Sequence, residues 1–207
     1  MPKMMMNPML KKYTNEDADD EESETSDEQI TVDKNKVMFY SDVDNKSCLK
    51  LIQCFNKAKE YVAIQNINNE FDDPMKVYIH ICSDGGEIFS SLSVIDTIIN
   101  SKVDVVTVCE GCVASAGVLI SLSGKERYIR KHAYMLIHEI RSGCIGKYSE
   151  CQDDMKNNDI IMNDMKTYMN ERCNNKLLKK KLNKVLKHDI IWDANKCLKY
   201  GLIDKIV

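Results

Sequence analysis

The sequence has no apolar run close to the roughly 20 residues that a membrane-spanning helix needs. Its N-terminal stretch also lacks the apolar core and cleavage site of a secretory signal. The lysines are scattered or lie on helix faces, so no basic cluster indicates nucleic-acid binding. With 207 residues and 43% hydrophobic content, the chain is long enough to bury one core. We therefore expect a soluble, cytoplasmic protein with neither a membrane nor a nucleic-acid partner.

A second cysteine pair with zinc-ligand spacing is also missing. Cys109 and Cys112 form one Cys-x-x-Cys, which is typical of a redox site or of half a zinc site. Nine cysteines, an odd number, favour a reducing compartment over a disulfide framework. We predict no metal site, and a redox role for the Cys109–Cys112 pair remains the alternative.

The acidic residues are unevenly distributed. Residues 16–28 hold nine acidic side chains, no basic one and no large apolar one, so this segment cannot offset the entropy of ordering. We predict that residues 1–35 form a disordered acidic extension and that residues 36–207 form the folded domain. The extension is either a solvating tail or a docking or gating element.

Apolar patterns that alternate between strand and helix follow the extension. Strands are expected at 37–40, 76–82, 103–109, 128–129 and 134–137, with helices at 44–63 and 87–100. This order predicts the α/β class, with a parallel or mixed sheet covered by helices. A long segment at 147–172 carries a narrow apolar seam, which favours either a hairpin with 176–187 or a protruding helix that contacts another subunit.

Ser115 is the main candidate for a catalytic side chain. It lies between Gly111 and Gly117, after an apolar strand and before an apolar helical run, where an α/β enzyme places a nucleophile. The helix that follows offers free amides and the positive end of its dipole to an oxyanion. The alternative is a serine that caps a buried helix.

A serine nucleophile needs a base, which is usually histidine. His138 ends a run of four apolar residues, 23 residues after Ser115, whereas His80 alternates with apolar residues and is expected to be structural. His132 and His188 lie in a charged turn and a loop. A lone histidine at a strand end can also be structural, so the residues alone leave both roles of His138 open.

Five blocks of sequence occur in an order that resembles a known family. They are 81–86, 111–117, 124–128, 135–138 and Ala194 with 200–204, and they look like the glycine turn, nucleophile turn, hairpin, histidine strand and C-terminal block of the Clp protease proteolytic subunit. The resemblance covers residues 37–207. It implies a Clp protease/crotonase-like fold of repeated β-β-α units with a long protruding handle helix at 147–172. A crotonase-type acyl-CoA enzyme shares the broad fold, but the catalytic blocks favour the peptidase.

The resemblance also assigns roles to residues. Ser115 matches the nucleophile, His138 the general base and Asp189 the acid that orients the base. There are two alternative acids. One is Asp193, which is expected as a helix N-cap, and the other is Asp204, which is part of the structural C-terminal block. The oxyanion donors are expected to be the backbone amides of Gly85 and Ala116. A peptide substrate is expected to bind as an added strand, with contacts to Gly86, Ile140 and Ser142.

The family resemblance further implies a serine endopeptidase that cuts unfolded polypeptides inside a barrel of two heptameric rings. An AAA+ unfoldase would use the ATP, so no cofactor is expected on this chain. The alternative is a catalytically silent subunit that assembles with another Clp-type subunit. Asp84, Ala116 and Glu139-Ile140 depart from the family pattern, and the usual N-terminal axial loop is not recognisable. The lack of a recognisable axial loop puts docking to an unfoldase in doubt.

Overall fold

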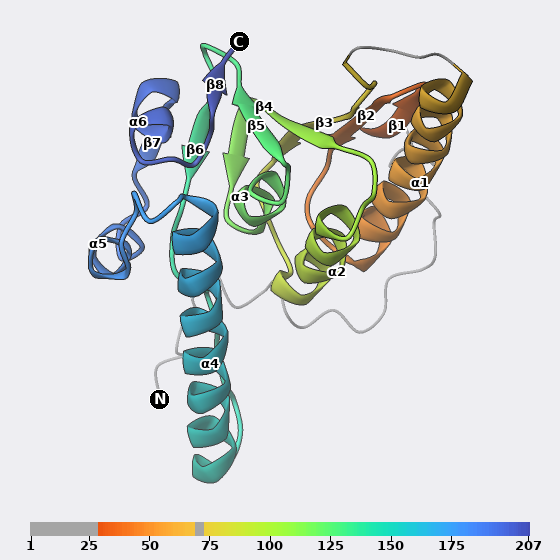
Figure 1. The fold of residues 1–207 in the computed structure, drawn as a ribbon. Coiled ribbons are helices and arrows are strands. Elements are labelled where there is room, and N and C mark those ends of the chain that lie inside the picture. Colours follow the sequence, from red (N-terminus) through yellow and green to blue (C-terminus); the bar gives the residue numbers. More distant parts are fainter. Residues whose placement is uncertain (1–28, 69–72) are drawn as a thin grey trace, which may run out of the picture.

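The computed structural model describes residues 29–68 and 73–207, which form one mixed α/β unit (Figure 1). Within these residues the sheet runs in the order β1-β2-β3-β4-β5-β8, and β6 and β7 extend it from β4. The strands are β1 (Ile30–Asp33), β2 (Lys36–Tyr40), β3 (Val77–Ser83), β4 (Val105–Ala114), β5 (Glu126–Ile129), β6 (Tyr134–Leu136), β7 (Ile191–Asp193) and β8 (Lys205–Ile206). The five predicted strands are confirmed.

Most strand pairs in the sheet are parallel. Only β1–β2 and β6–β7 are antiparallel. The ten-residue strand β4 pairs first with β5 and then, beyond Gly111, with β6. Gly111 has a φ of 56° and lies opposite a register shift between β3 and β4. This irregularity allows one strand to serve two successive partners and to continue to the position of Ser115.

The helices are α1 (Asn45–Asn68), α2 (Ile88–Ile99), α3 (Ala116–Ser121), α4 (Tyr148–Arg172), α5 (Lys179–Val185) and α6 (Ala194–Lys199). In Figure 1, α1, α2 and α3 lie together on one face of the sheet. Strand β3 shows why a core forms there, because its residues alternate between buried and half-buried. Ile79 and Ile81 are fully buried with Phe39 and Phe55, and each such side chain contributes about 1.5–3 kcal/mol.

Helix α4 projects away from the sheet (Figure 1). Its buried residues are Met165 and Met169, near its C-terminal end, while Tyr148 and Met155 are exposed. The C-terminal part packs against α5. The predicted protruding helix is therefore confirmed, with the packing against the 176–187 region limited to the end nearest the body. No helix of the described ranges is long and apolar enough to cross a membrane.

The folded body begins earlier than the sequence suggested. Strand β1 lies inside the predicted 1–35 extension, where Ile30 is buried and pairs with Phe39 across the antiparallel ladder. The segment Ile30-Thr31-Val32 alternates in the manner of a half-buried strand, and the acidic run before it obscured this pattern. The predicted acidic run at 16–28 lies outside the described residues.

The C-terminal block is fixed by a buried arginine. Arg127 is 4% exposed, and its Nε and Nη2 donate to the two carboxylate oxygens of Asp204 at 2.9 and 2.6 Å. Its Nη1 also donates to the Gly201 carbonyl. The prediction that Asp204 is structural is confirmed. Asp193 is the N-cap of α6, as predicted, and accepts a hydrogen bond from the Lys196 amide at 2.7 Å.

Candidate active site

Ser115 occupies a strained turn between β4 and α3. Its φ of 53° and ψ of −124° are unusual for a residue with a side chain, and its amide donates to the Leu136 carbonyl at 2.9 Å. Such a strand-to-helix turn exposes a hydroxyl at the edge of a sheet. Ser115 stands at the N-cap position, but its hydroxyl makes no capping hydrogen bond. The half-buried hydroxyl is therefore not explained by the capping role.

Gly85 lies against the Ser115 turn. A Cβ added at Gly85 would lie 2.5 Å from Ser115 Cβ, and the φ of 93° disfavours a side chain there. The Gly85 amide donates to Ser83 Oγ at 3.2 Å. The amides of Ala116, the first residue of α3, and of Gly86 have no acceptor within the described parts of the chain. Unpaired amides beside Ser115 suit an anionic oxygen.

Strand order explains how residues far apart in sequence reach one edge of the sheet. Strands β3, β4 and β6 are parallel neighbours, and the glycine turn, Ser115 and His138 follow their respective carboxyl ends. Ligands of open α/β sheets bind at this edge. Strand β7 runs antiparallel to β6, with Leu136 opposite Ile191. Beyond that pair the ladder ends, and the Glu139 amide donates to the Leu186 carbonyl at 2.8 Å, so His138 and Asp189 lie on neighbouring segments.

The imidazole of His138 is oriented by a backbone group. Its Nδ1 lies 2.7 Å from the Glu139 carbonyl oxygen. A carbonyl can only accept a hydrogen bond, so Nδ1 carries the proton and Nε2 of the neutral ring is the acceptor. This is the tautomer that a general base for a serine needs.

The three candidate side chains are not joined in a row. Across residues 29–68 and 73–207, no hydrogen bond links Ser115 to His138 or His138 to Asp189. Asp189 Oδ2 instead accepts from Nη2 of Arg141 at 2.6 Å, in an ion pair whose side chains are 54% and 75% exposed. The structure brings the three residues to the same edge and leaves Asp189 with a different partner.

The segment that follows His138 lies along α4. The Ile140 amide donates to Met162 Sδ at 3.4 Å, and Asn158 Nδ2 donates to the Ser142 hydroxyl at 2.7 Å. The Ser142 hydroxyl in turn donates to Asp154 Oδ2 at 3.2 Å. Two positions expected to contact a peptide strand are therefore held by the helix.

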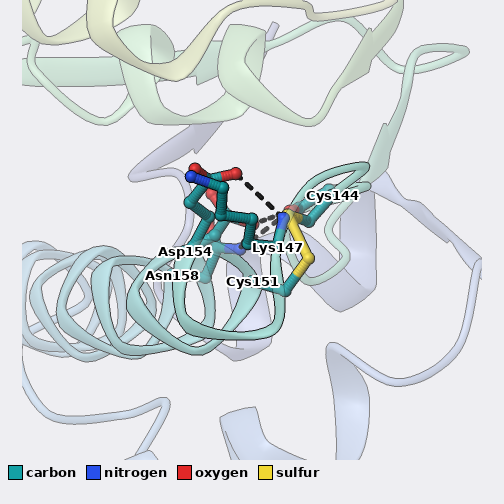
Figure 2. Close-up of a disulfide and its surroundings, with 7 residues drawn as sticks. Cys144, Lys147, Cys151, Asp154 and Asn158 are labelled. Atoms are coloured by element: carbon teal, nitrogen blue, oxygen red, sulfur yellow. Dashed lines mark hydrogen bonds between the residues drawn. A yellow bond between two sulfur atoms is a disulfide. The ribbon is translucent and has the colours of Figure 1, made fainter.

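A disulfide between Cys144 and Cys151 fastens the far end of this segment to the first turns of α4 (Figure 2). Their Cα atoms lie 5.6 Å apart, as a disulfide requires. The cysteine count predicted no disulfide framework, and this bond is the exception. The other seven cysteines are free. The count failed here because it ignores position: a helix start brings two nearby residues together whatever the total.

Within the described residues, the remaining candidates show no sign of a redox or metal site. Burial raises the pKa of the Cys109 thiol to about 12, and burial also raises the pKa of Cys112, so neither favours the reactive thiolate. The part of the chain that the structure describes contains no group of three or more potential metal ligands. His80 Nδ1 lies 3.0 Å from Glu110 Oε1, in a polar cluster on the sheet. Sequence reasoning treated His80 as structural but gave no sign of this cluster.

Comparison with known proteins identifies the family. The chain belongs to the Clp protease family, whose model matches residues 21–207. Two similar curated proteins are the ATP-dependent Clp protease proteolytic subunit 2 of Parasynechococcus marenigrum strain WH8102 and subunit 1 of Synechococcus sp. strain CC9902. Each is 28% identical over 155 residues, which cover 70% of this chain and 75% of the relative.

A solved structure shares the fold. A ClpP1 mutant from Listeria monocytogenes superposes with a TM-score of 0.70 over 84% of this chain and 91% of that chain, at 19% identity. The predicted α/β, Clp protease-like fold is thus confirmed, and the protein is a Clp-type protease by family.

Proposed function

We propose that this protein is a serine endopeptidase that hydrolyses unfolded polypeptides with Ser115 as the nucleophile. The observation that carries the proposal is the Ser115 turn. A strained backbone presents an uncapped hydroxyl beside the unpaired amide of Ala116. A purely structural serine would gain nothing from that strain.

The chemistry follows from the atoms at this edge. Ser115 Oγ attacks the scissile carbonyl while His138 Nε2 takes its proton, and the amide of Ala116 donates to the oxyanion. Gly85 supplies a second donor once its amide leaves Ser83 Oγ, and the adjacent Gly86 amide has no acceptor among the residues that the structure describes. His138 then gives the proton to the leaving amine, and water hydrolyses the acyl-enzyme. No step requires a cofactor.

The proposal requires a modest rearrangement. Ser115 and His138 follow paired parallel strands, and the Ser115 amide is bonded to the carbonyl of Leu136, two residues before His138, so both residues start from the same edge of the sheet. Catalytic hydrogen bonds are often long in the absence of substrate and shorten in its presence. Asp189 completes the row by moving from Arg141 to His138 Nδ1, where it stabilises the imidazolium.

Substrate and assembly follow from the same surfaces. A peptide added as a strand between Gly86 and the Ile140–Ser142 segment would lie across Ser115. Ring assembly, two stacked heptamers and an AAA+ unfoldase in the cytoplasm are part of this proposal. They are supported by the family match, since the relatives are named ATP-dependent proteolytic subunits.

A second candidate is a catalytically silent subunit that assembles with an active one. The specific observation in its favour is that Asp189 pairs with Arg141 while His138 bonds to a carbonyl. Against it, each catalytic position holds the required residue type.

Labelling with a fluorophosphonate probe separates the two candidates. We expect wild-type protein to be labelled, Ser115→Ala to be unlabelled, and peptide hydrolysis to fall about 10⁶-fold in that variant. Ser93→Ala, which removes an exposed serine from α2, is the matched control and should label normally. Labelling of both wild type and Ser115→Ala, or of neither, counts against Ser115 as nucleophile.

A further inference from the structure

We propose that Arg141 is a positioning residue that withholds Asp189 from His138 in the resting protein, so that its release completes the catalytic row. This inference rests on the proposed function, because it assigns a role to the third member of that site. The observation that supports it is the ion pair between Asp189 and Arg141, which lies three residues after His138.

The strand register places Asp189 at the edge of the sheet where His138 lies. Leu136 and Ile191 form the last pair of the antiparallel ladder between β6 and β7. Beyond that pair the two segments remain side by side, because the Glu139 amide donates to the Leu186 carbonyl at 2.8 Å. Asp189 lies between Leu186 and Ile191, and its Oδ2 is bonded to Arg141 Nη2. The ion pair with Arg141 is therefore the contact that occupies the Asp189 carboxylate in the observed state.

Arg141 is presented to Asp189 by a restrained segment. On one side of Arg141, the Ile140 amide is bonded to Met162. On the other side, the Ser142 hydroxyl accepts from Asn158. Figure 2 shows the disulfide that closes the same segment against α4. The guanidinium is thus held near Asp189 by α4.

His138 is satisfied without Asp189 in this state. Its Nδ1–H donates to the Glu139 carbonyl, which fixes the tautomer but brings no negative charge. An imidazolium formed during proton transfer is then stabilised less than it would be beside a free carboxylate. The ion pair with Arg141 also directs the Asp189 carboxylate toward a cation other than the imidazolium. The resting arrangement therefore has a correctly oriented base with reduced support for its charged form.

The strength of the pair suits a reversible contact. Both side chains are more than half exposed, and exposed ion pairs are weak and screened by salt. A peptide strand that takes the polar groups of Ile140 and Ser142 from α4 would displace Arg141 with them. Substrate binding would then itself deliver Asp189 to His138.

Substitution of Arg141 tests the proposal through the rate of probe labelling. A small fluorophosphonate avoids the peptide-binding strand, so its rate reports the nucleophile and its base. Arg141→Ala should label about two- to fivefold faster than wild type, in line with an exposed pair. Arg141→Lys keeps the charge and should stay close to wild type. Lys125→Ala is the matched control: it removes another exposed cation, paired with Asp104, and should change nothing.

The second readout is the pKa of the His138 imidazole, which NMR of ¹³C-labelled histidine measures. The variant His138→Gln identifies which signal belongs to His138. A freed carboxylate beside the ring raises the histidine pKa, so Arg141→Ala should raise it and move the acid limb of labelling to higher pH. The charged and titratable side chains on the two segments that flank the ring are Glu139, Arg141, Lys187, His188 and Asp189.

The Asp189→Asn background decides whether Arg141 acts through Asp189. There, Arg141→Ala should alter neither the labelling rate nor the His138 pKa. An effect of equal size in both backgrounds would mean that the arginine charge acts on His138 directly, which overturns the proposal. Unchanged rate and pKa in Arg141→Ala with normal wild-type labelling also overturn it, while the proposed function stands. If no variant is labelled, the proposed function fails, and the His138 pKa in the two backgrounds still decides the role of Arg141.

Discussion

Glu110 shows how a single side chain can organise a group of polar residues on the sheet. Its carboxylate accepts hydrogen bonds from the Tyr40 hydroxyl, His80 Nδ1 and Arg130 Nε. Burial alone would raise the pKa of Glu110, but these three hydrogen bonds lower it to about 2. The native state therefore favours the ionised carboxylate much more than the unfolded chain does.

The cluster predicts a pH-dependent stability. The folded pKa of Glu110 lies below its unfolded value, so its contribution is complete above about pH 4.5 and is lost as the pH falls toward 2. We expect Glu110→Gln to unfold at lower urea concentration than wild type at pH 7. The difference in the free energy of unfolding between wild type and Glu110→Gln should narrow by about 1 kcal/mol by pH 2. This figure allows for solvent screening at the half-exposed Arg130. A difference in unfolding free energy that stays constant from pH 7 to pH 2 would contradict the stabilising role of the ionised Glu110.

At the level of elements, the segment 139–147 forms no strand or helix of its own. Its position depends on hydrogen bonds to α4 and on one covalent link between Cys144 and Cys151. A disulfide that closes such a short loop stabilises by up to about 2.5 kcal/mol in the chain-entropy model. This segment is therefore the part of the catalytic edge most sensitive to loss of one bond.

Removal of the disulfide should loosen this segment more than the body. In Cys144→Ser we expect trypsin to cut after Arg141 and Lys147 about tenfold faster, because local opening becomes easier. The rate can be followed by mass spectrometry of timed digests. Cys82→Ser removes a free, half-buried thiol from β3 and is the control. Equal digestion of Cys144→Ser and wild type would show that the hydrogen bonds to α4 hold the segment by themselves.

On the scale of the whole molecule, the N-terminal part of α4 extends beyond the body with its part of the apolar seam uncovered. Tyr148 and Met155 lie seven residues apart, on the same face of the helix, and are 80% and 69% exposed. Burial of such side chains contributes about 1.5–3 kcal/mol each, so assembly gains from covering them. A second copy of this chain, whose α4 carries the same seam, is the proposed cover.

A charge in the seam should weaken the proposed stacking of rings. Met155→Glu is expected to shift the native mass from two stacked rings toward single rings, because assembly would bury an unpaired carboxylate. Asn157→Glu adds the same charge on the other side of α4 and should assemble as wild type. Native mass spectrometry over a concentration series measures both. If Met155→Glu leaves the mass unchanged, the seam is not the interface.

The sequence by itself determined the local structure and the family. The alternation in β3, the small residues around Ser115 and the long segment free of glycine and proline each depend on neighbours along the chain, so their patterns were readable. These patterns predicted the strands, the turn at Ser115 and the protruding helix. The start of β1 and the Cys144–Cys151 bond were missed because composition was weighed more heavily than position.

Only the tertiary structure decided which groups meet. The succession of β5 and β6 along β4 sets the edge of the sheet at which Ser115 and His138 lie, and the pairing of β6 with β7 puts Asp189 at the same edge. The sequence could not show that Asp189 pairs with Arg141, 48 residues away. A carboxylate binds whichever cation the fold places nearest, and that choice depends on distances in space that the spacing along a chain does not contain.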